Sequence, residues 1–236
     1  MAWYRSLAII TLTILFPPLH AVQAQTEERA PDTMEARVLA CAPCHGTRGQ
    51  GTGNDYFPRL AGKPAGYLHN QLIAFREGRR RYPPMNYLLA FLPDAYLRAM
   101  AEHFAAQTPP LPPPATPAVS KELLALGQSL ALRGNPERGI PACAGCHGLS
   151  FTGMEPAIPG LLGLRPNYIS AQLGAWRYGT RTALAPDCMQ FVAAHLTETD
   201  VTAVSAWLST QPAPANAAPA PPGTIPMLLP CGSQPN

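Results

Sequence analysis

The stretch CAPCH at residues 41–45 returns as CAGCH at residues 143–147, and both follow the pattern C-x-x-C-H. Two cysteines at this spacing lie about one helical turn apart, so both sulfurs can reach the two vinyl groups of one haem. The histidine that follows then directs its imidazole at the iron. A zinc site or a thioredoxin-like pair is the alternative, but zinc needs further ligands and the sequence offers few. We expect two covalently bound haems c, held by Cys41, Cys44, His45, Cys143, Cys146 and His147.

The two halves of the chain repeat one another around these motifs. With a shift of 101 positions, the matching pairs are Pro58 and Pro159, Leu60 and Leu161, Gly62 and Gly163, Tyr67 and Tyr168, Gln71 and Gln172, and Arg80 and Arg181. A repeat of this kind indicates a duplicated domain of roughly 80–95 residues. Because both arginines recur, we expect them to have a haem-related role, whereas Arg79 and Arg81 do not recur and fit a solvated surface.

Prolines mark the boundary between the repeats. Residues 108–117 have the sequence TPPLPPPATP, which cannot continue a helix or enter the interior of a sheet. We expect a semi-rigid linker there, between a first domain at residues 25–107 and a second at residues 118–211. Residues 212–236 are rich in proline and alanine, which predicts an extended C-terminal tail.

Each repeat has helical patterns and lacks a clear alternating strand pattern. Helices are predicted at residues 34–41, 67–77, 94–106, 121–132 and 168–178. Thr197 followed by Asp200 resembles a capping box at the start of one more helix. Three or four short helices enclose only a thin core, so something besides side chains has to fill each domain.

The N-terminus has the features of a secretory signal peptide. Arg5 precedes an apolar stretch at residues 7–16, two prolines end that stretch, and residues 22–24 have the sequence VQA, which fits a cleavage site. We expect residues 1–24 to be removed and the protein to be exported to the periplasm. An uncleaved anchor is the alternative. The apolar stretch is shorter than the roughly 18–20 residues that span a bilayer, so no span is expected after cleavage.

Composition excludes several classes of protein. A formal net charge of +3 is too small to indicate nucleic-acid binding by electrostatics alone. A hydrophobic content of 47% argues against a wholly disordered chain. Six cysteines are too few for a small domain held together by disulfides.

Each haem iron needs a second axial ligand from the protein. Met85 follows His45 by 40 residues and Met189 follows His147 by 42, and both are expected in proline-containing loops between helices. A thioether suits haem iron and raises its reduction potential. We assign Met100 to the core. The weaker alternatives are Met154, Met227, His69, His103 and His195. With histidine and methionine on both irons no position is open, which favours electron transfer over catalysis.

These features resemble the dihaem cytochromes c of the cytochrome c4 family. The resemblance rests on two C-x-x-C-H-G segments, on Pro58-x-Leu60-x-Gly62 with its repeat, and on Met85 and Met189, and it covers nearly all of residues 32–211. It implies an all-α fold of two tandem class-I-like cytochrome c domains whose haem edges meet near the domain interface. It also implies redox partner proteins, either a terminal oxidase or a membrane or periplasmic dehydrogenase. Peripheral membrane association is left open.

The resemblance leaves open whether the chain is a free carrier or a subunit. The alternative is the electron-accepting subunit of a periplasmic dehydrogenase, as in flavocytochrome c sulfide dehydrogenases. Cys188 and Cys231 belong to neither haem motif, and in an oxidising compartment we expect a disulfide between them. If Cys188 instead bound the second iron as a thiolate, the chain would be a sulfur-oxidising enzyme. A peroxide-reducing dihaem enzyme is a further rival. Our prediction is a carrier with no catalytic activity of its own.

Overall fold

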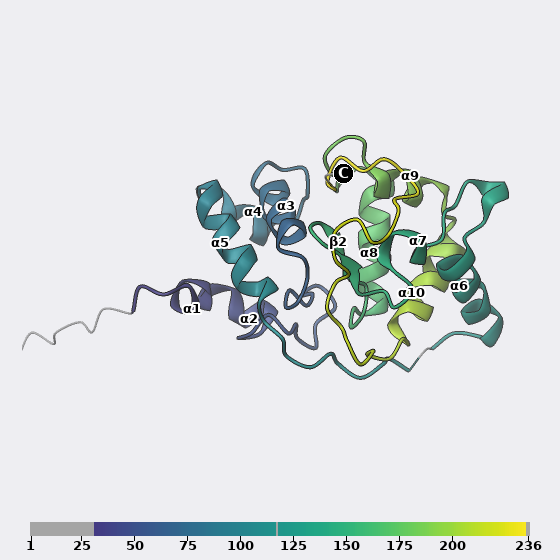
Figure 1. The fold of residues 1–236 in the computed structure, drawn as a ribbon, viewed down its shortest axis with the longest axis horizontal. Helices are drawn as coiled ribbons and strands as arrows, with labels where there is room; N and C mark the ends of the chain where they lie inside the picture. Colours follow the sequence, from purple (N-terminus) through teal and green to yellow (C-terminus); the bar gives the residue numbers. More distant parts are fainter. Residues whose placement is uncertain (1–30, 117, 235–236) are drawn as a thin grey trace, which may run out of the picture. The chain divides into compact units, whose positions relative to one another are not determined.

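The computed structural model describes residues 31–116 and 118–234 (Figure 1). The predicted signal peptide at residues 1–24 lies outside the described residues. Among the residues described, no helix combines the length and the apolar character needed to cross a membrane. We refer below to residues 31–107 as the first half and to residues 118–211 as the second half.

The first half consists of short helices. They are α1 (Met34–Arg37), the 3-10 helix η1 (Val38–Cys41), α2 (Ala42–His45), α3 (Ala65–Arg76), α4 (Pro83–Leu89) and α5 (Asp94–Ala105). Helices α3 and α5 pack against each other, and their apolar faces form most of the core. The fully buried members of this core are Val38, Leu68, Phe75, Leu89, Leu97, Met100, Ala101 and Phe104.

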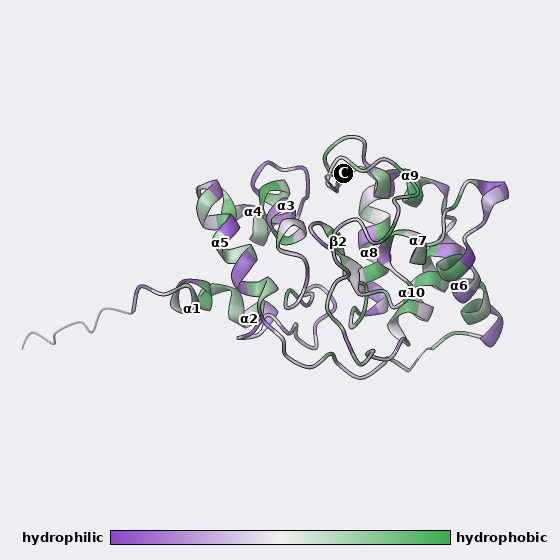
Figure 2. Cartoon of the chain, in the orientation of Figure 1, coloured by the Kyte–Doolittle hydropathy of each residue, from purple (hydrophilic) through white to green (hydrophobic). Residues whose placement is uncertain are grey.

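The second half repeats this arrangement with a longer first helix. Its elements are α6 (Lys121–Arg133), the 3-10 helix η2 (Pro136–Arg138), α7 (Ala144–His147), β1 (Gly153–Met154), β2 (Ile158–Pro159), α8 (Pro166–Arg177), α9 (Cys188–His195) and α10 (Glu198–Ser209). Helix α10 packs against α6 and α8 around a second core. Figure 2 shows α9 mainly in the green of hydrophobic residues, as expected for a helix that contributes to this core.

Most of the predicted helices are confirmed, with ends that differ by a residue or two. The predicted capping box is present: the Asp200 amide donates to Thr197 Oγ1 at 3.1 Å, and the Thr197 amide donates back to Asp200 Oδ2 at 2.8 Å. The helix predicted at residues 34–41 is divided, since only α1 is α-helical and η1 continues as 3-10 helix.

The prediction that Met85 and Met189 lie in loops is wrong. Both lie in the first turn of a short helix, α4 and α9 respectively. Pro83 and Pro84 occupy the first two positions of α4. Proline is tolerated there because the amide hydrogens of a first helical turn have no intrahelical partner. The antiparallel pair β1–β2 was also not predicted, because two residues per strand are too few to show alternation.

The linker and the tail are packed against the domains rather than free. The Arg59 guanidinium donates to the carbonyl oxygens of Pro109 and Pro110, at 2.5 and 2.9 Å. In the tail, the yellow trace in Figure 1, Ala220 exchanges backbone hydrogen bonds with Gly153 and Glu155 beside β1. Both segments therefore follow the surface of the helical halves.

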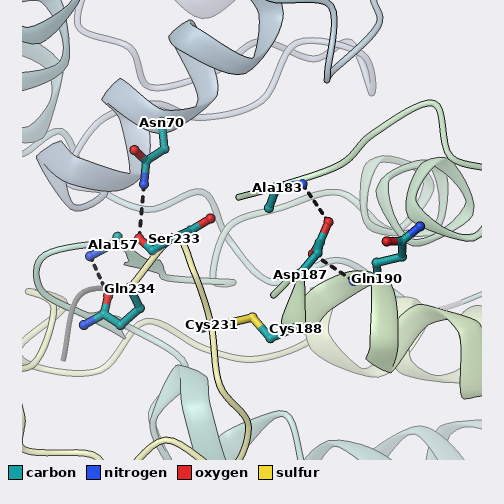
Figure 3. Close-up of a disulfide and its surroundings, with 9 residues drawn as sticks. All are labelled: Asn70, Ala157, Ala183, Asp187, Cys188, Gln190, Cys231, Ser233 and Gln234. Atoms are coloured by element: carbon teal, nitrogen blue, oxygen red, sulfur yellow. Dashed lines mark hydrogen bonds between the residues drawn. A yellow bond between two sulfur atoms is a disulfide. The ribbon is translucent and has the colours of Figure 1, made fainter. Parts of the chain in front are cut away.

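A disulfide joins Cys188, the first residue of α9, to Cys231 in the tail (Figure 3). The two Cα atoms are 5.1 Å apart, within the usual bridging range. The predicted disulfide is confirmed. Close to the bridge, the Gln234 side chain accepts from the Ala157 amide at 3.0 Å and donates to the Glu155 carbonyl at 3.2 Å. The end of the tail is thus fixed at two places on the second half.

Replacing both Cys188 and Cys231 by serine is expected to lower the free energy of unfolding by about 4 kcal/mol, because the bridge closes a long loop. The sequence separation of the two cysteines is 43 residues. Denaturant unfolding followed by circular dichroism measures the loss. Limited proteolysis should then cut the tail within residues 212–230, while the parent protein resists. An unchanged stability together with an uncut tail would contradict the prediction.

Candidate functional site

The two C-x-x-C-H motifs lie in the same local structure. In each half the second cysteine and the histidine belong to a single-turn helix, α2 or α7, which the first cysteine precedes. Gly46 and Gly148 end these helices with φ of +80° in both cases. Only glycine adopts this conformation without strain, so the residue after each histidine turns the chain away in the same manner.

Each motif histidine is held by one ring nitrogen. His45 Nδ1 donates to the carbonyl oxygen of Pro58 at 2.9 Å, and His147 Nδ1 donates to that of Pro159 at 2.8 Å. Because a carbonyl oxygen only accepts, Nδ1 carries the hydrogen and Nε2 keeps its lone pair. Each histidine is only 8% exposed. This is the tautomer and the fixed ring orientation that a metal-binding histidine requires.

Electrostatics also favour neutral imidazoles. Burial is the largest cause that lowers the pKa of His45, and Arg80 adds to the lowering. Burial likewise lowers the pKa of His147, and there the added cation is Lys63. The hydrogen bonds to the two proline carbonyls oppose these effects but do not reverse them. Neutral imidazole is the form that binds iron.

The four motif cysteines take part in no disulfide and are partly buried. Burial raises the pKa of Cys41, and raises that of Cys143 to about 11, so both are protonated at neutral pH. Across residues 31–116 and 118–234, no three His, Cys, Asp or Glu side chains converge as metal ligands. The zinc alternative therefore lacks the third and fourth ligands that it needs.

The two predicted methionine ligands pack near the motifs of their own halves. Met85 and Cys41 both pack against the hydrophobic cluster of the first half, and Met189 and Cys143 both pack against that of the second half. Each side chain is partly buried. The structure thus brings each methionine to the core that its haem motif borders.

Two polar residues that were not predicted hold the helices that carry these methionines. Asn86 donates to the carbonyl oxygen of Arg80 at 2.9 Å and accepts from the Tyr82 amide at 2.8 Å. In the second half, Asp187 accepts from the amides of Ala183 and Gln190, at 2.6 and 3.0 Å (Figure 3). An Asp or Asn next to a proline-rich segment is a signal for such anchoring.

Two of the weaker ligand candidates, Met154 and His195, have other contacts in the structure. The sulfur of Met154 accepts from the Ile225 amide at 3.4 Å, and Met100, which the sequence assigns to the core, lies in the first core. His195 Nδ1 donates to the carbonyl oxygen of Phe191 at 2.8 Å. The Cys188 sulfur is bonded to Cys231, so the alternative of a thiolate ligand is wrong.

Arg80 and Arg181 exchange hydrogen bonds between the two halves. The Arg80 guanidinium donates to Tyr168 and Gln172 at 2.9 and 2.7 Å. The Arg181 guanidinium donates to the matching pair of the other half, Tyr67 at 3.3 Å and Gln71 at 2.7 Å. Each arginine also donates to the glutamine of its own half, at 3.0 and 2.8 Å. All six residues recur in the repeat, but the sequence did not indicate that they pair across the halves.

The arginine cluster has a surplus of buried positive charge. Arg80 and Arg181 are 9% and 4% exposed, and within the described residues neither forms a salt bridge with a carboxylate. Burial alone would raise the pKa of Tyr67, but the charges of Arg181, Arg80 and Lys63 lower it. Buried charges are normally paired.

One buried donor beside the cluster also lacks a partner. Arg181 stacks on the ring of Trp176, with its guanidinium carbon 3.7 Å from the ring centroid. The Trp176 Nε1 hydrogen is buried and has no acceptor among the described residues. A haem carries two carboxylates, which supply negative charge and acceptors of the kind that this region lacks. The residues present therefore fit a haem in each half.

The C-terminal tail packs against α7, the helix of the second motif. A Cβ atom added at Gly148 would lie 3.3 Å from Ile225 Cδ1, and one added at Gly145 would collide with Leu228. Both tail residues therefore pack against α7 and its end. Among the described residues, no tail packs in this way on α2 of the first half.

Comparisons with known proteins agree with this geometry. No protein-family model matches the chain. It is 36% identical to the thiosulfate dehydrogenase electron acceptor of Thiomonas intermedia, over 88% of this chain and 91% of that protein. It is 40% identical to the protein of the same name from Stutzerimonas stutzeri, over 73% and 79%. It is 34% identical to cytochrome c4 of Pseudomonas aeruginosa, over 74% and 85%.

Solved structures give the same result. The crystal structure of reduced cytochrome c4 from Pseudomonas stutzeri matches with a TM-score of 0.66 and 29% identity, over 75% of this chain and 96% of that chain. Thiosulfate dehydrogenase from Marichromatium purpuratum matches with a TM-score of 0.66 and 34% identity, over 73% of this chain and 36% of that chain. The chain therefore belongs to the cytochrome c4 family, as its sequence predicted, and is an electron-transfer cytochrome c of all-α fold.

Proposed function

We propose that the chain is a periplasmic dihaem cytochrome c, with one covalently bound haem c in the domain at residues 25–107 and one in the domain at residues 118–211. Cys41 and Cys44 would form the thioether bonds of the first haem, and Cys143 and Cys146 those of the second. The axial ligands would be His45 with Met85 and His147 with Met189. The observation that carries the proposal is the pair of matched motifs in which each histidine has Nδ1 bonded and Nε2 free.

The residues of the chain would tune and protect this electron transfer. A bound haem supplies an iron that takes up and releases one electron. The carbonyls of Pro58 and Pro159 hold the imidazoles in one orientation, so little rearrangement accompanies the change of charge. The thioethers of Met85 and Met189 would close the remaining coordination position of each iron and raise its potential. The chain would then transfer electrons without catalysing a reaction of its own.

One experiment tests this proposal directly. Purified protein should contain two haems by the pyridine haemochrome assay, and its oxidised spectrum should be low-spin with the weak far-red band of methionine-ligated ferric haem. After reduction with dithionite, carbon monoxide should leave the spectrum unchanged. Carbon monoxide binding by the parent protein, or fewer than two haems, would overturn the assignment of ligands.

A second candidate function concerns the electron donor. The two relatives called thiosulfate dehydrogenase electron acceptor are 36% and 40% identical to the chain, against 34% for the cytochrome c4 of Pseudomonas aeruginosa. This supports, as a second candidate beside the general carrier, a role as the electron acceptor of a periplasmic thiosulfate dehydrogenase. In stopped-flow mixing, a thiosulfate dehydrogenase with thiosulfate should reduce both haems within seconds. Thiosulfate alone should leave them oxidised, and equal reduction without the dehydrogenase would indicate an enzyme.

A further inference from the structure

Lys63 is a buried cation that crosses from the first half to the second. The chain has two lysines, Lys63 and Lys121, and Lys63 is only 8% exposed. Its ammonium donates to the carbonyl oxygen of Gly160 at 2.7 Å. Gly160 follows Pro159, the residue whose carbonyl oxygen holds His147 at 2.8 Å. The ammonium is therefore fixed one peptide away from the anchor of the second motif histidine.

No negative charge neutralises this ammonium within the described residues, where Lys63 takes part in no salt bridge. Of its titratable neighbours, Tyr67 raises the pKa of Lys63 and the positive Arg59 lowers it. Burial lowers the pKa of Lys63 to about 8, so the side chain still carries its proton at pH 7. A buried charge acts strongly on its surroundings, because little water screens it.

The second half has no counterpart of the buried Lys63. A shift of 101 positions places Leu164 opposite Lys63 and Gly160 opposite Arg59. The reverse contact, from the second half to the first, is a different one: the Arg165 guanidinium lies 3.6 Å from a carboxylate oxygen of Asp55 in an ion pair that water reaches. Arg80 and Arg181 match each other, so they cannot by themselves make the two haem sites differ. Lys63 has no counterpart in the second half, so it can make them differ.

We propose that Lys63 tunes the second haem, so that its charge holds the reduction potential of the iron bound by His147 above the value that the ligands alone would give. This rests on the proposed function, which places a haem there. Reduction of a haem held there by the redox partner would lower the charge of the site by one, while Lys63 would keep its proton. A fixed positive charge opposes the ferric state more than the ferrous state, and so favours the reduced form. His147 lies within the field of this ammonium.

The test compares three kinds of variant at pH 7 by optical redox titration. Lys63→Gln keeps a donor for the Gly160 carbonyl but removes the charge. Lys63→Leu introduces leucine, the residue at the matching position of the second half, Leu164. Lys63→Arg keeps the charge. Lys121→Gln removes the same charge from an exposed position at the start of α6 and is the matched control.

In Lys63→Gln and Lys63→Leu, the equilibrium constant for reduction of one haem should fall about tenfold, or about 59 mV for one electron, and that of the other haem much less. Lys63→Arg and Lys121→Gln should leave both constants within about twofold of the parent. Proton NMR of the reduced protein assigns the affected haem, because the signal of an axial methionine methyl disappears in Met85→Ala. The haem whose potential falls in the Lys63 variants should be the one whose methionine signal remains in Met85→Ala, which is the haem assigned to Met189.

Three results would overturn the proposal. One is unchanged potentials in the neutral variants that retain two haems. The others are an equal fall of the potential in Lys63→Arg and a fall confined to the first haem, since either would point to a structural effect. The proposed function fails in a different way, because the parent protein would then lack the second haem in the pyridine haemochrome assay.

Discussion

Replacing Met85 by alanine is expected to open one of the two haem irons to carbon monoxide and to leave the other closed. The methyl group of alanine cannot reach or bind iron, so under the proposed ligation the sixth position of the first haem would become available. The far-red band of methionine-ligated ferric haem should fall to about half its intensity, and the potential of that haem should fall as well. The carbon monoxide difference spectrum of the reduced protein should correspond to one haem per chain.

Matched variants separate ligation from packing. Met189→Ala should open the other haem, and the double variant should open both. Met100→Leu changes a core methionine of the first half, 6% exposed, and should leave both irons closed. If Met85→Ala binds no carbon monoxide, or if Met100→Leu binds it, then Met85 is not the ligand of the first iron.

Replacing Gly127 by alanine is expected to destabilise the second half by about 3 kcal/mol, or more if the helices cannot move apart. Gly127 lies in the middle of α6, where this helix crosses α10. A Cβ atom there would collide with the carbonyl oxygen of Ala203 and lie 2.9 Å from Trp207 Cβ. The obstacle is mainly the backbone of α10, which cannot rotate away as a side chain would.

Gly174, in the middle of α8, is the control for this variant. A Cβ atom added there meets nothing within 4 Å among the described residues. Gly174→Ala should therefore stabilise the protein by about 0.5–1 kcal/mol, because alanine favours the helix and restricts the unfolded chain. Denaturant unfolding of both proteins with haem bound gives the comparison. Equal stabilities would show that α6 and α10 do not pack as closely as the structure indicates.

Local signals in the sequence were sufficient to predict much of this fold. The helices of each half have apolar residues at helical spacing, and a capping box needs only four consecutive residues, so both are visible without tertiary information. The spacing of the C-x-x-C-H motifs is local as well. The disulfide between Cys188 and Cys231 followed from the two cysteines that neither motif uses.

Features that depend on distant parts of the chain were not predictable. Helices α4 and α9 begin with Pro83 and Cys188, and a proline-rich segment indicates a loop unless its surroundings are known. The hydrogen bond of Lys63 joins residues that are 97 positions apart. No periodicity carries information about such a pair, because it depends on how two separately folded surfaces meet.

The reciprocal hydrogen bonds of Arg80 and Arg181 make the contact between the halves isologous, in the sense used for twofold dimers. The same patch on each half meets its own counterpart, as it would between identical subunits. In a true homodimer every substitution appears at both sites, so both redox centres stay equal. Joining the halves in one chain removes that constraint. Within the described residues, Lys63 lies opposite Leu164 and the tail packs on one of the two motifs. A symmetric dimer cannot have such differences, and under the proposed function they would allow the two haems to differ in potential.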